Sequence, residues 1–178
     1  MFGTQADPCA PWGGSFLNFG AAITGSAGQV TITPSSAASS GGCEATAPYR
    51  TLFLPVRVLD VQKLPSAYTG LQMFDADGVD ATTLEVTGGE LKAIATDGGG
   101  EQVIGRAPYD AVEMRWWQLR PTATSVVIET SADAKSWTVR AVHSYTPGSG
   151  AKIVVIAGTV APAVQSDSAN FGDVNVCP

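Results

Sequence analysis

Short stretches in which apolar and polar residues alternate run along most of the chain, and turns rich in glycine and proline separate them. In residues 49–61 the apolar positions recur at every second residue, at Leu52, Leu54, Val56 and Val58. This period puts successive side chains on opposite faces of a β-strand. Residues 152–160 (KIVVIAGTV) are almost continuously apolar, which is typical of a strand buried on both faces. No segment has the spacing of an amphipathic helix.

The pattern predicts about eleven strands, spaced by about 8–16 residues. They cover residues 16–23, 29–33, 49–61, 70–74, 82–86, 90–95, the surroundings of Trp116 and of Ile128, and then 137–145, 152–160 and 169–176. Residues 34–42 read as a Ser/Ala/Gly loop. Strands with one apolar face need a second layer to cover it. The predicted fold class is therefore all-β, a two-sheet antiparallel β-sandwich, with a core that contains Leu54, Val56, Val58, Ile128 and residues 154–156.

Two adjacent tryptophans, Trp116 and Trp117, make residues 109–138 the most distinctive segment. The alternation of Val112, Met114 and Trp116 predicts a strand, on which neighbouring rings point to opposite faces. One ring then belongs to the core and the other to the outer face, where an aromatic surface can stack on a sugar ring. An alternative is that loops or arginine side chains cover both rings. If a ligand binds, we expect it to contact one of the two tryptophans together with Arg115, Gln118 or Arg120.

The same segment carries a resemblance to a known superfamily. Its motif reads Tyr109-Asp110, Arg115-Trp116-Trp117, Glu129-Thr130-Ser131, Asp133 and Trp137-Thr138, and residues 169–176 (ANFGDVNV) resemble a closing strand. These residues are similar to the late strands of the concanavalin A-like lectin/glucanase superfamily, jelly rolls related to laminin G-like domains. Gln118 stands where a second arginine is common there, and Ala134 where a turn glycine is usual. The resemblance implies a jelly roll, and it implies no single function, because one fold hosts many activities.

Catalytic residues are not apparent in the sequence. Glucanases of the resembled superfamily carry an E-x-D-x-E run, which sets carboxylates side by side on one strand, and this chain has no such run. Asp110 and Glu113 are three residues apart and would face opposite sides of a strand. Glu129 stands among apolar neighbours, and we expect it to pair with Arg115 across the strands. The only histidine, His143, has no nucleophile near it in the sequence, so we predict a protein that is not an enzyme.

The sequence predicts a protein without cofactors, and a calcium site is the alternative. Asp75, Asp77 and Asp80 lie in one turn, and carboxylates at such spacing are good oxygen donors for calcium. The resemblance adds weight, since laminin G-like domains bind calcium at a rim. The glycine and glutamate positions of an EF-hand loop do not match, and a hairpin turn rich in Asp and Gly explains the same residues. One histidine and three scattered cysteines do not form a zinc motif.

Three cysteines, Cys9, Cys43 and Cys177, leave one thiol unpaired whatever the bridge. In jelly rolls of the resembled superfamily, the first and last strands are antiparallel neighbours. The resemblance therefore favours Cys9–Cys177 narrowly over Cys9–Cys43. Either bridge indicates an oxidising location, outside the cell or on the surface of a particle.

Length and charge restrict the partners. The chain has 178 residues, enough for one domain with a sizeable core, and a formal net charge of −6 with only 15% charged residues. A net negative surface argues against nucleic acid and against anionic membranes as partners. No apolar run reaches the roughly 18 residues of a membrane span. The first residues, MFGTQADPCAPWGG, lack the basic and apolar regions of a signal peptide.

These observations favour a non-catalytic structural or adhesion subunit on a virion, such as a phage tail or capsid decoration protein, with host-surface glycans as its ligands. The alternative is a carbohydrate-binding module of a secreted bacterial protein; a glycan-processing enzyme is disfavoured by the missing carboxylates. We divide the chain into an N-terminal arm, residues 1–11, and a sandwich, residues 12–178. The arm has two prolines and an apolar Phe2, so we expect it to pack against a neighbouring subunit of a larger assembly.

Overall fold

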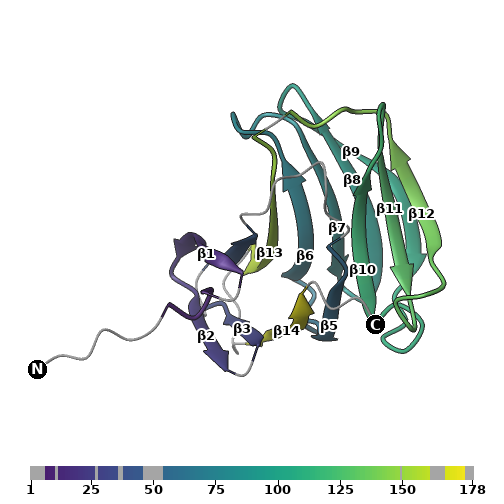
Figure 1. Ribbon diagram of the computed structural model, residues 1–178. Helices are drawn as coiled ribbons and strands as arrows, with labels where there is room; N and C mark the ends of the chain where they lie inside the picture. Colours follow the sequence, from purple (N-terminus) through teal and green to yellow (C-terminus); the bar gives the residue numbers. More distant parts are fainter. Residues whose placement is uncertain are drawn as a thin grey trace, which may run out of the picture.

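A computed structural model of the chain describes residues 7–10, 12–26, 28–35, 38–45, 54–148, 150–160 and 167–174. Within these ranges the chain forms fourteen strands and no helix, and the strands make two antiparallel sheets of seven strands each (Figure 1). The predicted all-β sandwich is therefore confirmed. The described part of the chain contains no helix that is long and apolar enough to cross a membrane.

The first sheet has the strand order β1-β4-β13-β6-β7-β8-β9. Its strands are β1 (Gly13–Phe19), β4 (Ser39–Ala45), β13 (Lys152–Thr159), β6 (Ala67–Phe74), β7 (Ala81–Thr87), β8 (Glu90–Asp97) and β9 (Gly100–Pro108). Two-residue turns, Gly88-Gly89 and Gly98-Gly99, join β7 to β8 and β8 to β9, and all four glycines have positive φ. Tight turns of this kind match the twist of the paired strands and fix their register.

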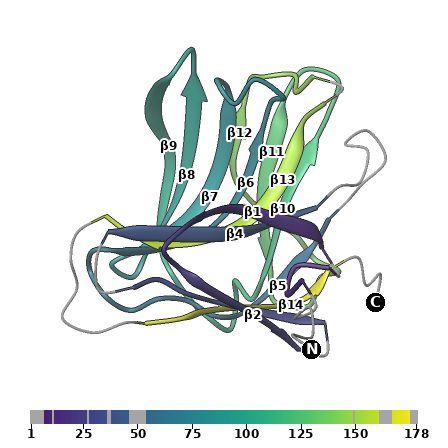
Figure 2. The same cartoon turned by 90° about the vertical axis from the view of Figure 1, so that its left-hand side faces the viewer.

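The second sheet has the strand order β12-β11-β10-β5-β14-β3-β2. Its strands are β12 (Thr138–His143), β11 (Val126–Ser131), β10 (Trp116–Pro121), β5 (Val56–Asp60), β14 (Ala169–Val174), β3 (Gln29–Thr33) and β2 (Ala22–Ser26). Figure 2 shows the two layers from the side, with β1 and β4 in one and β2, β5 and β14 in the other. The chain therefore changes layers several times, as in a Greek-key or jelly-roll arrangement.

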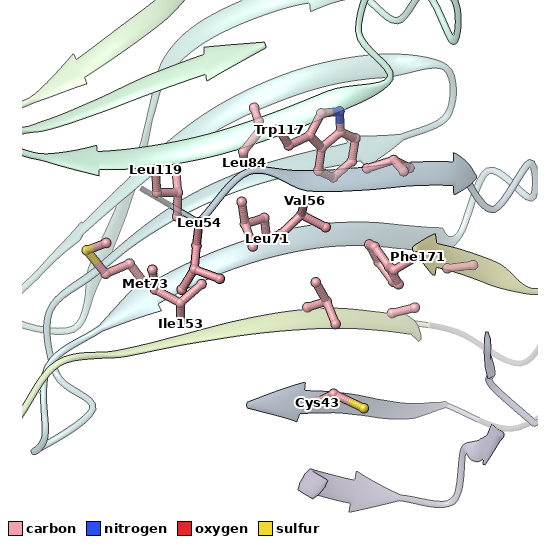
Figure 3. Close-up of a cluster of buried hydrophobic side chains, with 14 of the residues drawn as sticks. Cys43, Leu54, Val56, Leu71, Met73, Leu84, Trp117, Leu119, Ile153 and Phe171 are labelled. Atoms are coloured by element: carbon pink, nitrogen blue, oxygen red, sulfur yellow. The ribbon is translucent and has the colours of Figure 1, made fainter. Parts of the chain in front are cut away.

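The core lies between the inner faces of the two sheets (Figure 3). Alternate residues of each strand enter it, such as Leu71 and Met73 from β6 and Trp117 and Leu119 from β10, all at most 1% exposed. The predicted core is confirmed for Leu54, Val56, Val58, Ile128 and Val155, which all belong to this buried cluster. Val154 and Ile156 point to the outer side of the first sheet, where Val154 is fully buried and Ile156 is half-buried.

Three strands were not expected from the sequence. The predicted strand 16–23 is divided near Gly20 into β1 and β2, which belong to different sheets. β4 lies in the stretch that reads as a loop, because its glycines allow close packing: a Cβ on Gly42 would come within 2.5 Å of the Val155 carbonyl oxygen. β9 is an edge strand with mostly exposed side chains, so it lacks an apolar period.

The segment before β10 is a turn and not part of the strand. The Asp110 carboxylate accepts hydrogen bonds from the backbone N–H groups of Val112 and Glu113, at 2.8 and 3.0 Å. Both hydrogen bonds lower the pKa of Asp110 below its ordinary value, and the bond from Glu113 has the larger effect. Val112 is 57% exposed, and β10 begins only at Trp116. The alternation upstream of Trp116 therefore did not indicate a strand.

The disulfide joins Cys9 to Cys43, with 5.3 Å between their Cα atoms. The favoured pairing, Cys9–Cys177, is wrong, and the alternative is confirmed. The reason is topological: β1 pairs with β4, which carries Cys43, whereas β14 lies in the other sheet between β5 and β3. Cys177 itself lies outside the described residues.

The described part of the N-terminal arm belongs to this sandwich. Cys9 is fully buried, and its backbone N–H donates to the Asp7 carboxylate at 2.9 Å. The backbone of Pro8 lies so close to Gly25 that a Cβ there would meet the Pro8 carbonyl oxygen at 2.3 Å. Residues 1–6 and 11 lie outside the described residues, so docking of the arm on another subunit stays a prediction for residues 1–6.

The turn between β11 and β12 supplies a stability prediction. Ala134, where the resembled superfamily usually has glycine, has φ of 59°, the left-handed region that a Cβ disfavours. We expect Ala134→Gly to stabilise the chain by about 0.5–1 kcal/mol, less than the whole strain because glycine also loses more backbone entropy on folding. Thermal unfolding should then show a Tm higher by roughly 2–3 °C. Ala123→Gly, at an exposed loop position without positive φ, should instead lower the Tm; equal changes in both variants would contradict the argument.

Candidate functional site

The two adjacent tryptophans of β10 have different environments. Trp117 is 0% exposed, its indole Nε1 donates to the Met114 carbonyl at 2.8 Å, and Tyr109 packs edge-on against its ring at 6.2 Å between centroids. Trp116 points to the opposite, outer face of the second sheet and is half-buried. Trp117 is therefore a core residue, and Trp116 is the tryptophan of this pair that a ligand could contact.

The polar groups beside Trp116 are engaged within the protein. Arg120 Nε and Nη2 each donate to a different oxygen of Glu129 at 2.9 Å, and Gln118 Nε2 donates to the same carboxylate at 3.2 Å. The hydrogen bond to Glu129 is the main cause that raises the pKa of Arg120 above its ordinary value. Glu129 is 5% and Gln118 3% exposed, so this network is a structural tie between β10 and β11.

These contacts revise the predicted ligand site on β10. The expected Glu129–Arg115 pair is wrong, because Glu129 binds Arg120, while Arg115 Nε donates to the Val112 carbonyl at 3.1 Å. Trp117 and Gln118 are buried and drop out as ligand contacts. A ligand contact at Trp116, Arg115 and Arg120 stays a prediction, and both arginines are engaged in hydrogen bonds within the protein.

The three aspartates considered for calcium do not face one another. Asp75 Oδ1 accepts from Gly148 N at 2.6 Å, Asp77 Oδ1 from Val79 N at 3.1 Å, and Asp80 Oδ1 from Gly98 N at 2.7 Å. Each carboxylate therefore holds a separate loop segment in place. Across the described ranges, no three His, Cys, Asp or Glu residues come together in a group that could hold a metal ion.

His143 takes part in a hydroxyl–imidazole–carboxylate series that links both sheets. Its Nδ1 lies 2.7 Å from Thr82 Oγ1 and its Nε2 lies 3.0 Å from Asp97 Oδ1. Because a carboxylate only accepts, the imidazole Nε2–H donates to Asp97. Thr82 is 0% exposed, so no substrate can reach this hydroxyl. The series is a tie between β7, β8 and β12 and not a nucleophilic site.

The outer face of the first sheet is hollowed by a groove of about 490 Å³. This volume is in the range of small-molecule binding sites. Strands β6, β7 and β8 form its floor, with β9 on one side and β13 on the other. We use the name "the groove" for the surface formed by the side chains that face it, which include Tyr68, Gln72, Thr83, Glu85, Thr87, Lys92, Ile94, Glu101, Val103 and Ile156.

The aromatic ring of Tyr68 lines the groove, and Gly158 makes room for it. Gly70 lies between Ile156 and Glu85 in the strand register and leaves the middle of the floor without a side chain. A Cβ on Gly158 would meet the Tyr68 hydroxyl oxygen at 2.5 Å and two of its ring carbons at 2.6 and 2.8 Å. The ring of Tyr68 therefore crosses directly over Gly158. Burial is the largest cause that raises the pKa of Tyr68, so the phenol stays neutral at physiological pH.

Several polar side chains of the groove have unused hydrogen-bonding capacity. Within the described part of the chain, no hydrogen bond or ion pair engages the side chains of Gln72, Thr83, Lys92 or Glu101. Glu85 accepts one hydrogen bond, from the Thr87 hydroxyl at 2.5 Å. The groove thus offers an amide, a hydroxyl, an ammonium group and two carboxylates beside an aromatic ring. The outer face of β10 differs, since its polar groups bind one another.

Little in the sequence indicates this groove. Its polar residues alternate with the core residues Leu71, Leu84 and Leu91, as any solvent-facing residues of a half-buried strand would. The signal that could have been used is the placement of Gly70 and Gly158 within otherwise apolar strands, which indicates a close approach of other groups. The tryptophan pair is a stronger pattern, and it predicted a ligand site on the second sheet instead.

The chain is similar in fold to several solved structures. It matches a functionally unknown protein from Saccharomyces cerevisiae with a TM-score of 0.67 and 17% identity, over 91% of this chain and 95% of that one. It matches the carbohydrate-binding module CBM66 from Bacillus subtilis with a TM-score of 0.55 and 13% identity, over 89% and 92% of the two chains. LamAcat from Zobellia galactanivorans matches with a TM-score of 0.59 and 10% identity, over 85% and 80%. At these identities the likeness shows a common sandwich fold.

In sequence, the chain matches no protein-family model and no curated protein.

Proposed function

We propose that this chain is a non-catalytic carbohydrate-binding domain that holds a glycan in the groove of its first sheet. The observation that carries the proposal is the combination of the Tyr68 ring with unengaged polar side chains on one hollowed surface. A sugar ring has apolar C–H faces and a periphery of hydroxyl groups. The faces favour an aromatic ring, and the hydroxyls need hydrogen-bond partners once water is removed.

The structural relatives add support. One of them is named as a carbohydrate-binding module, and another structure of LamA was solved in complex with laminaritriose and laminaritetraose. Both show that sandwiches of this fold work on or with sugars in other proteins. In this chain the proposal rests on the groove itself, because fold alone does not determine function. Membership of the concanavalin A-like superfamily is part of the same proposal.

Binding without hydrolysis is favoured by the arrangement of the carboxylates. Glycosidases use two carboxyl groups about 5 Å apart, or about 6.5–9.5 Å apart when they invert configuration. On β7, the same-face neighbours of Glu85 are Thr83 and Thr87. The other groove carboxylate, Glu101, lies two strands away, which is about 10 Å across the sheet, and four residues further along, about 13 Å. Glu90, diagonal to Glu85, is paired with Arg106 at 2.6 Å.

We further propose that the domain works outside the cell, on a virion or within a secreted protein. The Cys9–Cys43 disulfide supports this location, since such bonds persist in oxidising surroundings. An adhesion subunit of a virion and a module of a secreted bacterial protein would both use the groove in the same way. Residues 1–6 are the candidate contact with a neighbouring subunit.

The test compares two aromatic residues on opposite faces. We expect Tyr68→Ala to weaken glycan binding at least about 10-fold, in line with the loss of a stacking ring and its buried area. Trp116→Ala, the matched control on the second sheet, should leave affinity unchanged. Binding is found on an array of immobilised oligosaccharides and measured by calorimetry, and the Tm of both variants is recorded.

Three outcomes would overturn the proposal. The groove is not the site if Trp116→Ala abolishes binding and Tyr68→Ala does not. The function is wrong if the intact chain binds no glycan. The domain is catalytic if prolonged incubation with a bound oligosaccharide releases shorter products.

A further inference from the structure

We infer that the groove selects uncharged glycans and rejects acidic ones, such as chains of uronic acids. This inference rests on the proposed function and names the class of sugar that the site accepts. It follows from the charges that face the groove and from the way in which they are left unpaired.

The groove carries more negative than positive charge. In the part of the chain that the structure describes, its lining contains the carboxylates of Glu85 and Glu101 and one ammonium group, that of Lys92. At the nearby edge, Glu90 and Arg106 neutralise each other in an ion pair of 2.6 Å. The whole chain, with these residues included, has a formal net charge of −6. A carboxylated or sulfated sugar would therefore meet net repulsion here, and the concave shape of a groove strengthens such a field.

Lys92 and Glu85 form a donor and an acceptor for neutral hydroxyl groups. They are directly opposite each other in the register of β7 and β8, so their Cβ atoms are about 5 Å apart. Among the ion pairs of the described residues none joins these two side chains. The ammonium group can donate to one sugar hydroxyl while the carboxylate accepts from its neighbour. Such a pair recognises adjacent hydroxyls, and its charges balance without a charge on the sugar.

Tyr68 and Gln72 on β6 also favour an uncharged glycan. Both point into the groove, and neither carries a charge at physiological pH. Among the described residues that line the groove, Lys92 is the one cationic side chain. Recognition of a carboxylate or sulfate ordinarily relies on arginine in a bidentate contact. The described lining of the groove contains no arginine, so it cannot make this bidentate contact with a ligand.

The test reverses the charge of the groove at one position. Glu101→Lys replaces two carboxylates and one ammonium by one carboxylate and two ammonium groups. Glu113→Lys changes the charge of the whole chain by the same amount at an exposed residue outside the groove. The probes are neutral tetrasaccharides of glucose, galactose and mannose, and a tetramer of galacturonic acid. Affinities are measured on the full chain at low and at physiological salt.

In the intact chain and in Glu113→Lys, we expect the best neutral tetrasaccharide to bind at least about 10-fold more tightly than the galacturonate at low salt. In Glu101→Lys the galacturonate should gain at least about 10-fold, and this gain should shrink as salt is raised. The neutral tetrasaccharide carries no charge, so it should show no gain of this kind that depends on salt.

Each contrary result has its own meaning. If the intact chain binds galacturonate as tightly as neutral sugars, and Tyr68→Ala removes that binding, the selectivity is wrong while the proposed function holds. If Glu113→Lys gains as much as Glu101→Lys, the selectivity comes from the whole surface and the groove assignment of charge is wrong. If none of the probes or arrayed glycans binds, both the inference and the proposed function fail.

Discussion

Replacing Trp117 by alanine is expected to lower the free energy of unfolding by about 3–5 kcal/mol, the range for removal of a large aromatic side chain from a core. The indole is 0% exposed and packs within the cluster that Figure 3 shows, near Leu84 and Val56. Its removal leaves a cavity, deprives Tyr109 of its edge-on contact, and frees the Met114 carbonyl that now accepts from Nε1. Urea unfolding measured by circular dichroism reports the change.

The neighbouring residue is the control for this prediction. Trp116 is half-buried on the outer face of β10, so Trp116→Ala should cost only about 1 kcal/mol or less. A conservative variant, Trp117→Phe, should recover part of the loss because it refills most of the cavity. Equal destabilisation by Trp116→Ala and Trp117→Ala would show that the outer ring is also part of a packed layer.

The two adjacent tryptophans show how much of a β-sandwich can be predicted from the sequence. Alternation at period two placed Leu54, Val56 and Val58 in the core correctly, because burial of one face is the physical cause of the pattern. It also showed that Trp116 and Trp117 had to face opposite ways. It could not show which ring was inside, since that depends on the layer that covers each face, and the layer comes from strands far away in the chain.

The strands that were missed lack the burial that produces a pattern. β9 has a neighbour on one side only and exposes most of its residues. β4 lies between β1 and β13, but five of its seven residues are Ser, Gly or Ala, and these small residues let it fit closely beside β13. Small residues read as a loop in the sequence because the same composition suits both situations. Only the three-dimensional contacts distinguish them.

The groove was missed for a related reason. Polar residues at alternate positions, such as Gln72, Thr83 and Lys92, are what any water-facing sheet displays. Their special property is that they converge on one hollow and bind nothing within the described chain, and this property arises from the register of five strands. Sequence spacing within one strand carries no information on that register.

The cysteine pairing depended on the order of strands in space, which a resemblance can suggest and only a topology can determine. With β1 at the edge of the first sheet beside β4, Cys9 lies over Cys43, and the disulfide sulfur of Cys9 is 3.7 Å from the Gly42 carbonyl oxygen. Both sulfurs are fully buried. The bridge therefore fastens the segment before β1 to the middle of β4.

We expect the double variant Cys9→Ala/Cys43→Ala to lose about 4 kcal/mol of unfolding free energy, because the bridge closes a segment with a sequence separation of 34 and so restricts the unfolded chain. Alanine avoids a buried hydroxyl at either position, so the measured loss reports mainly the cross-link, with a smaller packing cost for the two buried sulfur atoms. Cys177→Ala is the matched control: it removes the third cysteine and leaves the Cys9–Cys43 bridge intact, so its unfolding curve should coincide with that of the native chain under oxidising conditions. Addition of a thiol reductant in denaturant should bring the native chain to the stability of the double variant and leave the double variant unchanged. A loss below about 1 kcal/mol, or a Cys177→Ala variant as unstable as the double variant, would show that the Cys9–Cys43 bridge does not stabilise this fold.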